Sequence, residues 1–229
     1  MRLSLLKERC SRWSKNLTPP GDNKQIVLVV DDDPLVRASM DSLLRSVGLS
    51  TRTFASATEV LEADLPDANC CLVVDIRMPQ IGGLEFQTRL IARGDDVPII
   101  FVTGHGDIPM SVKAMKAGAV DFLAKPFRDQ DMLDAVASAL ARDKERRAAR
   151  SDLAASRALY DRLTPREREV MAGVVRGLLN KQIAGELGLS EITIKLHRSS
   201  LMKKMGTRSV ADLVRAAEFL TRHADGVRH

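Results

Sequence analysis

Carboxylate side chains gather at one point in the first half of the sequence, directly after a short run of β-branched residues. Asp31, Asp32 and Asp33 follow the run Ile26–Val30, and Asp75 ends a second apolar run further along the chain. Carboxylates held close together need a cation between them, and hard oxygen ligands favour Mg²⁺. Because Mg²⁺ bridges readily to phosphate oxygens, the cluster predicts a site for phosphoryl chemistry.

A hydroxyl and an ammonium group occupy comparable positions later in the chain. Thr103 follows the apolar run Pro98–Val102, and Lys125 follows Val120–Ala124. If these runs are parallel strands, their carboxyl ends meet at one edge of a sheet, beside the carboxylates. A strand-end aspartate can then act as a nucleophile and form an aspartyl phosphate, whose added oxygens the hydroxyl and the ammonium would stabilise.

Each of these residues also has an ordinary explanation when it is taken alone. An aspartate after a strand is frequently the cap of the next helix. Thr103 and Gly104 can form a simple turn, and Lys125 before Pro126 can be a surface side chain. The set is more specific than its members, because separate strand ends all carry groups that suit one chemistry.

The elements that would position these groups alternate between strand and helix as far as about Arg142. The expected strands are Ile26–Val30, Thr51–Phe54, Leu72–Val74, Pro98–Val102 and Val120–Ala124. The expected helices are Pro34–Val47, Thr58–Ala63, Leu84–Ala92, Met110–Ala117 and Gln130–Ala141. This order predicts an α/β fold, a doubly wound five-stranded parallel sheet with helices on both faces.

The rest of the chain predicts a separate all-α domain. A capping box at Thr164–Glu167 opens it, and helices are expected at 165–176, 181–187, 191–205 and 209–222. We therefore divide the chain into an N-terminal tail at 1–23, an α/β domain at 24–142, a helical linker at 143–162 and an all-α domain at 163–229.

Charge separates these two domains. Residues 24–142 carry 12 basic and 17 acidic side chains, whereas residues 143–229 carry 18 basic and 11 acidic ones, so the second half is the candidate for nucleic-acid binding. The apolar runs are shorter than the roughly 20 residues that cross a bilayer. Three cysteines make no disulfide framework, which favours a cytoplasmic protein without a membrane partner.

Two short helices around a tight turn form a helix-turn-helix in the basic half. The first is expected at 180–187 with Asn180 as its cap, and the second, Glu191–Met205, is capped by Ser190 after a turn at Gly188. In such a motif the second helix enters the major groove of double-stranded DNA.

Helical position sorts the second helix into two faces, at about 100° per residue. The buried face is expected to hold Ile194, His197, Leu201 and Met205, and the opposite, DNA-facing side to hold Ile192, Lys195, Leu196, Ser199 and Lys203. Lys195 can donate to guanine and Leu196 can touch a thymine methyl group. The expected phosphate contacts are Lys181, Arg198, Lys203 and Lys204, and Thr193 is expected among the DNA contacts. For Lys203 and Lys204 a solvated helix end remains an equal alternative.

Four segments in the first half resemble the receiver domain of response regulators, in particular that of the FixJ group: Val29–Arg37, Val73–Pro79, Val102–Asp107 and Ala114–Phe127. The resemblance covers residues 25–140 and implies a fold like that of flavodoxin. It implies that a sensor histidine kinase phosphorylates Asp75. It also implies that Asp31, Asp32, Asp75 and the main-chain carbonyl of Arg77 hold Mg²⁺, with Asp33 left to cap the next helix.

The same resemblance implies how the phosphoryl group is sensed. Thr103 would move its hydroxyl onto that group, Phe122 would be the rotating switch aromatic, and Lys125 would pair with the phosphate. Pro126 matches a proline that follows a cis peptide bond in the family. The face formed by the fourth helix and the fifth strand would dimerise.

Three segments in the second half resemble the LuxR-type helix-turn-helix of the NarL/FixJ family: Leu163–Val170, Asn180–Ala184 and Thr193–His197. The resemblance implies a four-helix module whose last helix dimerises on an inverted-repeat DNA site. Leu179 and Ser199 depart from the family pattern, so the operator need not match those of relatives. The two resemblances together imply a two-component transcription regulator, not an enzyme, that becomes a homodimer when phosphorylated and activates transcription with RNA polymerase.

Two other interpretations fit parts of the sequence. The pair Asp31 and Asp33 after a first strand resembles the nucleophile motif of magnesium phosphoaspartyl phosphatases, which would make the protein an enzyme. That reading leaves Asp75 and the basic half unexplained. Alternatively, the receiver is degenerate and never phosphorylated, in which case DNA binding does not respond to a phosphodonor.

Overall fold

The structure, a computed structural model, describes residues 24–104 and 108–224. The expected tail at 1–23 lies outside these residues. The chain divides into two compact units, with the division between Glu145 and Arg146. No helix in the described part is both long and apolar enough to cross a membrane.

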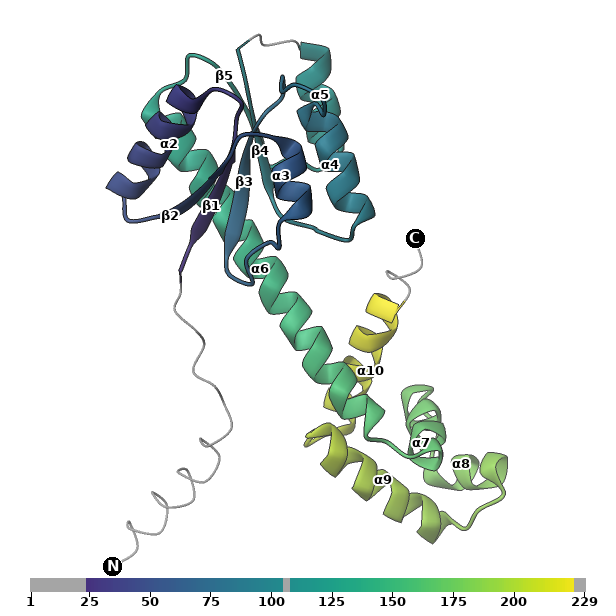
Figure 1. The fold of residues 1–229 in the computed structure, drawn as a ribbon. Coiled ribbons are helices and arrows are strands. Elements are labelled where there is room, and N and C mark those ends of the chain that lie inside the picture. The colour runs from purple at the N-terminus through teal and green to yellow at the C-terminus, as the bar shows by residue number, and fades with distance from the viewer. Residues whose placement is uncertain (1–23, 105–107, 225–229) are drawn as a thin grey trace, which may run out of the picture. The chain divides into compact units, whose positions relative to one another are not determined.

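A five-stranded parallel sheet forms the centre of the first unit (Figure 1). Its strands are β1 (Ile26–Val30), β2 (Ser50–Phe54), β3 (Cys70–Asp75), β4 (Ile99–Thr103) and β5 (Asp121–Ala124), and their order across the sheet is β2-β1-β3-β4-β5. All four strand pairs are parallel, so the predicted doubly wound α/β fold is confirmed. Every strand therefore ends at the same edge of the sheet.

Helices cover both faces of the sheet (Figure 1). The helices of this unit are α2 (Pro34–Ser46), α3 (Ala57–Glu62), α4 (Gly83–Ala92), α5 (Ile108–Lys116) and the first part of α6 (Asp129–Asp161). Side chains alternate along each strand: Leu28 and Val30 pack with α3, α4 and α5, whereas Val27 and Val29 pack with α2 and α6. Burial on both faces explains why the three central strands, β1, β3 and β4, are nearly continuous apolar runs, whereas the edge strands β2 and β5 carry more polar and exposed residues.

Local capping sets where α2 begins. The side chain of Asp33 accepts a hydrogen bond from the main-chain N–H of Leu35 at 2.8 Å, and Pro34 occupies the first helical position. The prediction that Asp33 caps this helix is thus confirmed. The cap holds the β1–α2 loop, which carries Asp31 and Asp32, at the carboxyl edge of the sheet.

The last helix of the first unit is longer than predicted. The sequence pattern predicts a helix that ends at Ala141 and a separate helical linker at 143–162. The linker is helical as far as Asp161, but it is continuous with the preceding helix as α6. No glycine or proline interrupts it, and its alanine, arginine and leucine residues favour helix. Its buried residues run from Met132 to Asp143, whose carboxylate accepts a hydrogen bond from the main-chain N–H of Cys70 at 3.0 Å.

The second unit contains four helices after α6: α7 (Pro165–Val175), α8 (Asn180–Leu187), α9 (Glu191–Met205) and α10 (Val210–Ala224). They enclose one core that includes Val170, Ile183, Ile194, Leu201 and Leu213. Helices α7 and α8 approach closely at Gly173, where an added Cβ would lie 2.8 Å from Cγ1 of Ile183. The predicted all-α helix-turn-helix domain is confirmed.

One predicted cap is wrong. Asn180 is the first helical residue of α8, and Leu179 holds the capping position, where its main-chain N–H donates to Oε1 of Gln182 at 2.8 Å. The Asn180 side chain instead accepts a hydrogen bond from Arg198 on α9 at 2.8 Å. A partner from the neighbouring helix therefore replaces the local cap that an asparagine usually provides.

Candidate functional site

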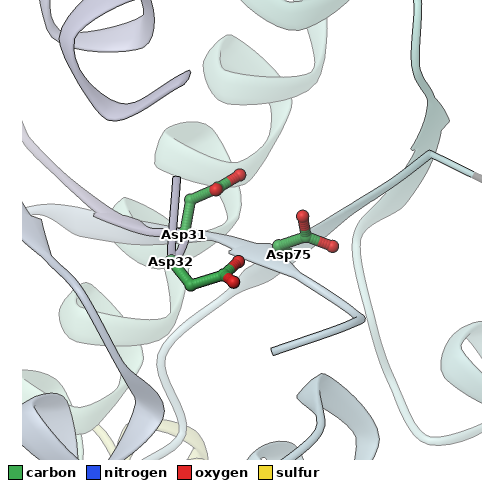
Figure 2. A group of neighbouring side chains, drawn as sticks. All are labelled: Asp31, Asp32 and Asp75. Atoms are coloured by element: carbon green, nitrogen blue, oxygen red, sulfur yellow. The ribbon is translucent and has the colours of Figure 1, made fainter. Parts of the chain in front are cut away.

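Three aspartates meet where β1 and β3 end. Asp31 and Asp32 follow β1, and Asp75 is the last residue of β3, its neighbour in the sheet. One carboxylate oxygen from each lies within 4.8 Å of the others, and Figure 2 shows the three side chains next to one another. Asp31 is buried, Asp75 is 9% exposed and Asp32 is exposed, so the cluster opens to solvent on one side.

Main-chain donors orient two of these carboxylates. Oδ1 of Asp31 accepts from the N–H of Asp33 at 2.9 Å, and Oδ1 of Asp75 accepts from the N–H of Arg77 at 3.0 Å. Each aspartate thus bonds to the residue two positions ahead, in the loop that follows its strand. This arrangement leaves the other carboxylate oxygen of each residue available to a cation.

A positive group already contacts both of those oxygens. The ammonium of Lys125, after β5, lies 2.8 Å from Oδ2 of Asp31 and 2.9 Å from Oδ2 of Asp75. The Lys125–Pro126 peptide bond is cis, as the receiver resemblance implies. Burial by itself lowers the pKa of Lys125, but hydrogen bonds to the two carboxylates outweigh it, and the pKa is raised.

The pKa of Asp31 is also raised, but here burial outweighs the hydrogen bonds. Burial raises it, and the hydrogen bonds from Lys125 and from the N–H of Asp33 lower it only in part. The nearby charge of Asp75 raises it further. A carboxylate in this position gains from any additional positive charge, because such a charge stabilises its ionised form.

Sequence reasoning missed Arg37. Its guanidinium, on the first turns of α2, donates to the main-chain carbonyls of Asp31 at 2.6 Å and Asp32 at 3.0 Å. It therefore fixes the loop that carries both carboxylates. The signal was present, because an arginine in the first turns of a helix can reach back to the loop before it, but we expected no role for it.

Thr103 and Phe122 complete the set of expected switch residues. Thr103 is the last residue of β4 and is fully buried, and its carbonyl accepts from the N–H of Lys125 at 2.7 Å. Phe122 lies in β5 opposite Phe101 of β4 and is half-buried against the core that contains α5. The sheet thus places both residues on strands that border the aspartates and Lys125.

The donor set of the cluster fits a hard divalent cation. It consists of carboxylate oxygens alone, which Mg²⁺ prefers to nitrogen or sulfur ligands. Mg²⁺ takes oxygens at about 2.0–2.1 Å. Oxygens within 4.8 Å of one another are therefore near the spacing that a shared ion requires.

Helix α9 presents the two predicted faces in the second unit. Ile194, Leu201 and Met205 are buried and His197 is half-buried, so the predicted inner face is confirmed. The exposed side holds Ile192, Lys195, Leu196, Ser199 and Lys203, and Ile192 and Leu196 are 71% and 67% exposed. Apolar side chains this exposed beside lysines are suited to contact with DNA bases and thymine methyl groups.

The remaining basic residues of this motif differ from one another. Lys181 is exposed at the start of α8, whereas Arg198 is half-buried and donates to Asn180. Lys204 lies against Glu167 of α7 at 2.7 Å, not on the exposed face. Thr193 bonds through its hydroxyl to Ser190, the cap of α9, at 2.8 Å.

A receiver-like sheet and a helix-turn-helix in one chain are the two parts of a transcriptional response regulator. Comparison with known proteins supports this class: residues 27–137 match the model of the response regulator receiver domain, and residues 161–217 match that of the bacterial regulatory proteins of the luxR family. The chain belongs to the response regulators of the NarL/FixJ type. These proteins are regulators of transcription, so the prediction that the protein is not an enzyme is confirmed.

Three relatives illustrate the similarity. Nodulation protein W of Bradyrhizobium diazoefficiens is 54% identical over 87% of this chain and 88% of its own length. The transcriptional regulatory protein FixJ of Azorhizobium caulinodans is 44% identical over 83% of this chain and 90% of its own. The low-resolution structure of response regulator StyR has 49% identity and a TM-score of 0.78, and the match covers 85% of this chain and 98% of that one.

Proposed function

We propose that a partner histidine kinase phosphorylates Asp75, and that phosphorylation drives dimerisation and binding to an inverted-repeat DNA site. The observation that carries this proposal is that Asp75 lies close to two other carboxylates and in contact with the ammonium of Lys125. An acidic site with one fixed ammonium suits a group that brings negative charge and needs a cation to hold it.

The chemical step transfers the phosphoryl group from a histidine nitrogen of the kinase to Asp75, and solvent water supplies the one proton that the departing imidazole takes up. An oxygen of Asp75 attacks the phosphorus of a phosphohistidine; a P–O bond forms as the P–N bond breaks, and the electron pair stays on the imidazole nitrogen, which takes up a proton. Asp31, Asp32 and Asp75, with the carbonyl of Arg77, would hold Mg²⁺. A bound Mg²⁺ neutralises charge on the phosphoryl oxygens.

A groove beside the cluster is suited to the kinase. It encloses about 380 Å³ and is lined by residues of α2 and of the segment after β5, namely Leu35, Val36, Ser39, Met40, Leu43, Lys125, Pro126, Phe127 and Asp129. Leu35 is 78% exposed at its rim. An apolar groove lined in part by Lys125, whose ammonium contacts Asp75, gives a histidine-bearing helix a place to dock near Asp75.

The switch follows from charge. Phosphorylation adds about −1.5 to −2 charge, and Thr103 and Lys125 gain contacts only when that group is present. The equilibrium therefore moves toward a conformation in which both face the phosphoryl group, with Phe122 repositioned. Val112 and Met115 are exposed on α5, which supports the face of α5 and β5 as the surface that dimerises.

Exposed residues of α9 support sequence-specific binding. We assign base contacts to Lys195 and Leu196, further DNA contacts to Thr193 and Ser199, and phosphate contacts to Lys181, Arg198 and Lys203. A dimer presents two such helices and so requires an inverted repeat. We further propose that the protein activates transcription through RNA polymerase and is located in the cytoplasm. The proposed domain boundaries fall after residues 23, 142 and 162.

Intact mass after treatment with acetyl phosphate and Mg²⁺ tests the proposal. Wild type should gain one phosphoryl group and Asp75→Asn none. If wild type gains none, the receiver is a degenerate one and the proposal is wrong. If Asp75→Asn gains the group as readily as wild type, the acceptor is a different residue.

A further inference from the structure

A single buried carboxylate joins α7 to the DNA-facing helix. Glu167 is 3% exposed and occupies the third position of α7, where Oε2 accepts from the N–H of Thr164 at 2.8 Å. The same carboxylate accepts from the hydroxyl of Ser200 at 2.6 Å and from the ammonium of Lys204 at 2.7 Å. It therefore caps its own helix and also binds two side chains of α9.

The two α9 donors are one helical turn apart. Ser200 and Lys204 are four residues apart and lie on the same side of the helix. Attachment at two points along one side opposes rotation of α9 about its axis. Apolar packing of Ile194 and Leu201 alone is less directional, because dispersion and burial depend weakly on angle.

The polar contacts lie on both flanks of the buried face. At about 100° per residue, Ser200 and Lys204 fall on one side of the Ile194–Leu201 face, and Arg198 falls on the other. Arg198 donates to Asn180 of α8, so α9 has a polar attachment to α8 as well as to α7. Both attachments oppose rotation of α9 about its axis, which would move exposed side chains such as Lys195.

The positive charge of Lys204 is paired with a carboxylate inside the second unit. Its ammonium lies against a carboxylate that is almost wholly buried, and charge-assisted hydrogen bonds of this length are among the stronger ones. Burial raises the pKa of Glu167, but the hydrogen bonds from Lys204, Ser200 and Thr164 outweigh burial and lower the pKa to about 2. The carboxylate is therefore ionised and matches the cation at neutral pH.

We propose that Glu167 is a positioning residue for DNA recognition: through Ser200 and Lys204 it sets the rotation of α9, and Lys204 serves this attachment instead of a DNA phosphate. The inference rests on the proposed DNA contacts of α9. It separates two adjacent lysines, because Lys203 is exposed and remains a phosphate contact whereas Lys204 does not.

The test compares these two lysines in the full chain treated with acetyl phosphate and Mg²⁺. The probes are a duplex that wild type selects from a random pool and a scrambled duplex of equal length. Failure of wild type to select any duplex would count against the proposed function itself. With a selected duplex, Lys204→Met and Glu167→Gln should lower the ratio of specific to nonspecific affinity about tenfold. Neither should alter the salt dependence.

The matched control is Lys203→Met, which should weaken specific and nonspecific binding alike. The slope of the logarithm of the binding constant against the logarithm of salt concentration should fall by about one phosphate contact. The double variant Glu167→Gln, Lys204→Met should be no worse than the poorer single variant, because both remove one attachment. If Lys204→Met behaves as Lys203→Met does, Lys204 is a phosphate contact and the proposal is overturned. That comparison holds even if Glu167→Gln does not fold.

Discussion

The ammonium of Lys125 lies 2.9 Å from Oδ2 of Asp75, although the two residues are 50 positions apart in the chain. Asp75 is the last residue of β3, and Lys125 directly follows β5. The same ammonium also contacts Asp31. Lys125 is therefore placed to exchange a carboxylate partner for a phosphoryl oxygen on Asp75. This exchange would link the chemistry at Asp75 to the position of β5.

Lys125→Met should still be phosphorylated but should no longer dimerise in response. Asp75 keeps its nucleophilic oxygen, so intact mass should still show an added phosphoryl group after acetyl phosphate treatment. Dimerisation measured by light scattering should no longer respond to the donor, because the phosphoryl group lacks its ammonium partner. A variant that still dimerises fully on phosphorylation would show that Lys125 does not transmit the signal.

Asp31 and Asp33 should differ in effect, although both follow β1. Asp33 caps α2 through Leu35, so Asp33→Ala should cost about 1 kcal/mol of stability and leave phosphorylation in place. Asp31→Asn removes a charge from the cluster and should slow phosphorylation strongly. Mass spectrometry and urea unfolding separate these effects. Turnover of a phosphomonoester that depends on Asp31 and not on Asp75 would instead support the phosphatase reading.

Lys195→Ala should weaken binding to a selected duplex by about 1–3 kcal/mol and leave nonspecific binding nearly unchanged. The reason is that Lys195 lies on the exposed side of α9, where it can reach a base edge. Lys181→Ala is the control, because loss of a phosphate contact weakens both kinds of binding alike. An unchanged ratio of specific to nonspecific affinity in Lys195→Ala would exclude a base contact.

Glu167 should make the second unit sensitive to acid. Its pKa of about 2 in the folded protein lies below the ordinary value of 4.5, so its stabilisation is complete above 4.5 and is lost as the pH falls through 2. Linkage sets an upper limit of about 3 kcal/mol on this contribution at pH 7. Amide hydrogen exchange of α9 in wild type and Glu167→Gln, compared at equal pH, measures it. A difference that persists undiminished at pH 2 would contradict this origin.

The sequence predicted the elements whose pattern is local. Apolar runs that end at Asp31, Asp75 and Thr103 identify the ends of the three central strands, because a parallel strand that is buried on both sides has no polar face. The two faces of α9 follow from helical periodicity alone, as Ile194 and Leu196 illustrate. Both predictions need only residues that lie near one another in the chain.

Features that depend on distant partners could not be predicted in the same way. Asn180 has the chemistry of a cap, and only the presence of Arg198 on another helix explains its different contact. The pairing of Glu167 with Lys204 joins residues 37 positions apart, and many acid–base pairs at that separation are possible. The unbroken α6 is a different case, because the absence of glycine and proline between Ala141 and Asp161 was visible in the sequence.

Phosphorylation of Asp75 is expected to change the oligomeric state of the protein. The most direct measurement is the molar mass in solution, by sedimentation equilibrium, of wild type and Asp75→Asn with and without acetyl phosphate and Mg²⁺. Wild type should shift from monomer to dimer on addition of the donor, whereas Asp75→Asn should give the same mass in both conditions. A donor-dependent dimer in Asp75→Asn, or a phosphorylated wild type that keeps its resting mass, would show that phosphorylation of Asp75 does not control dimerisation.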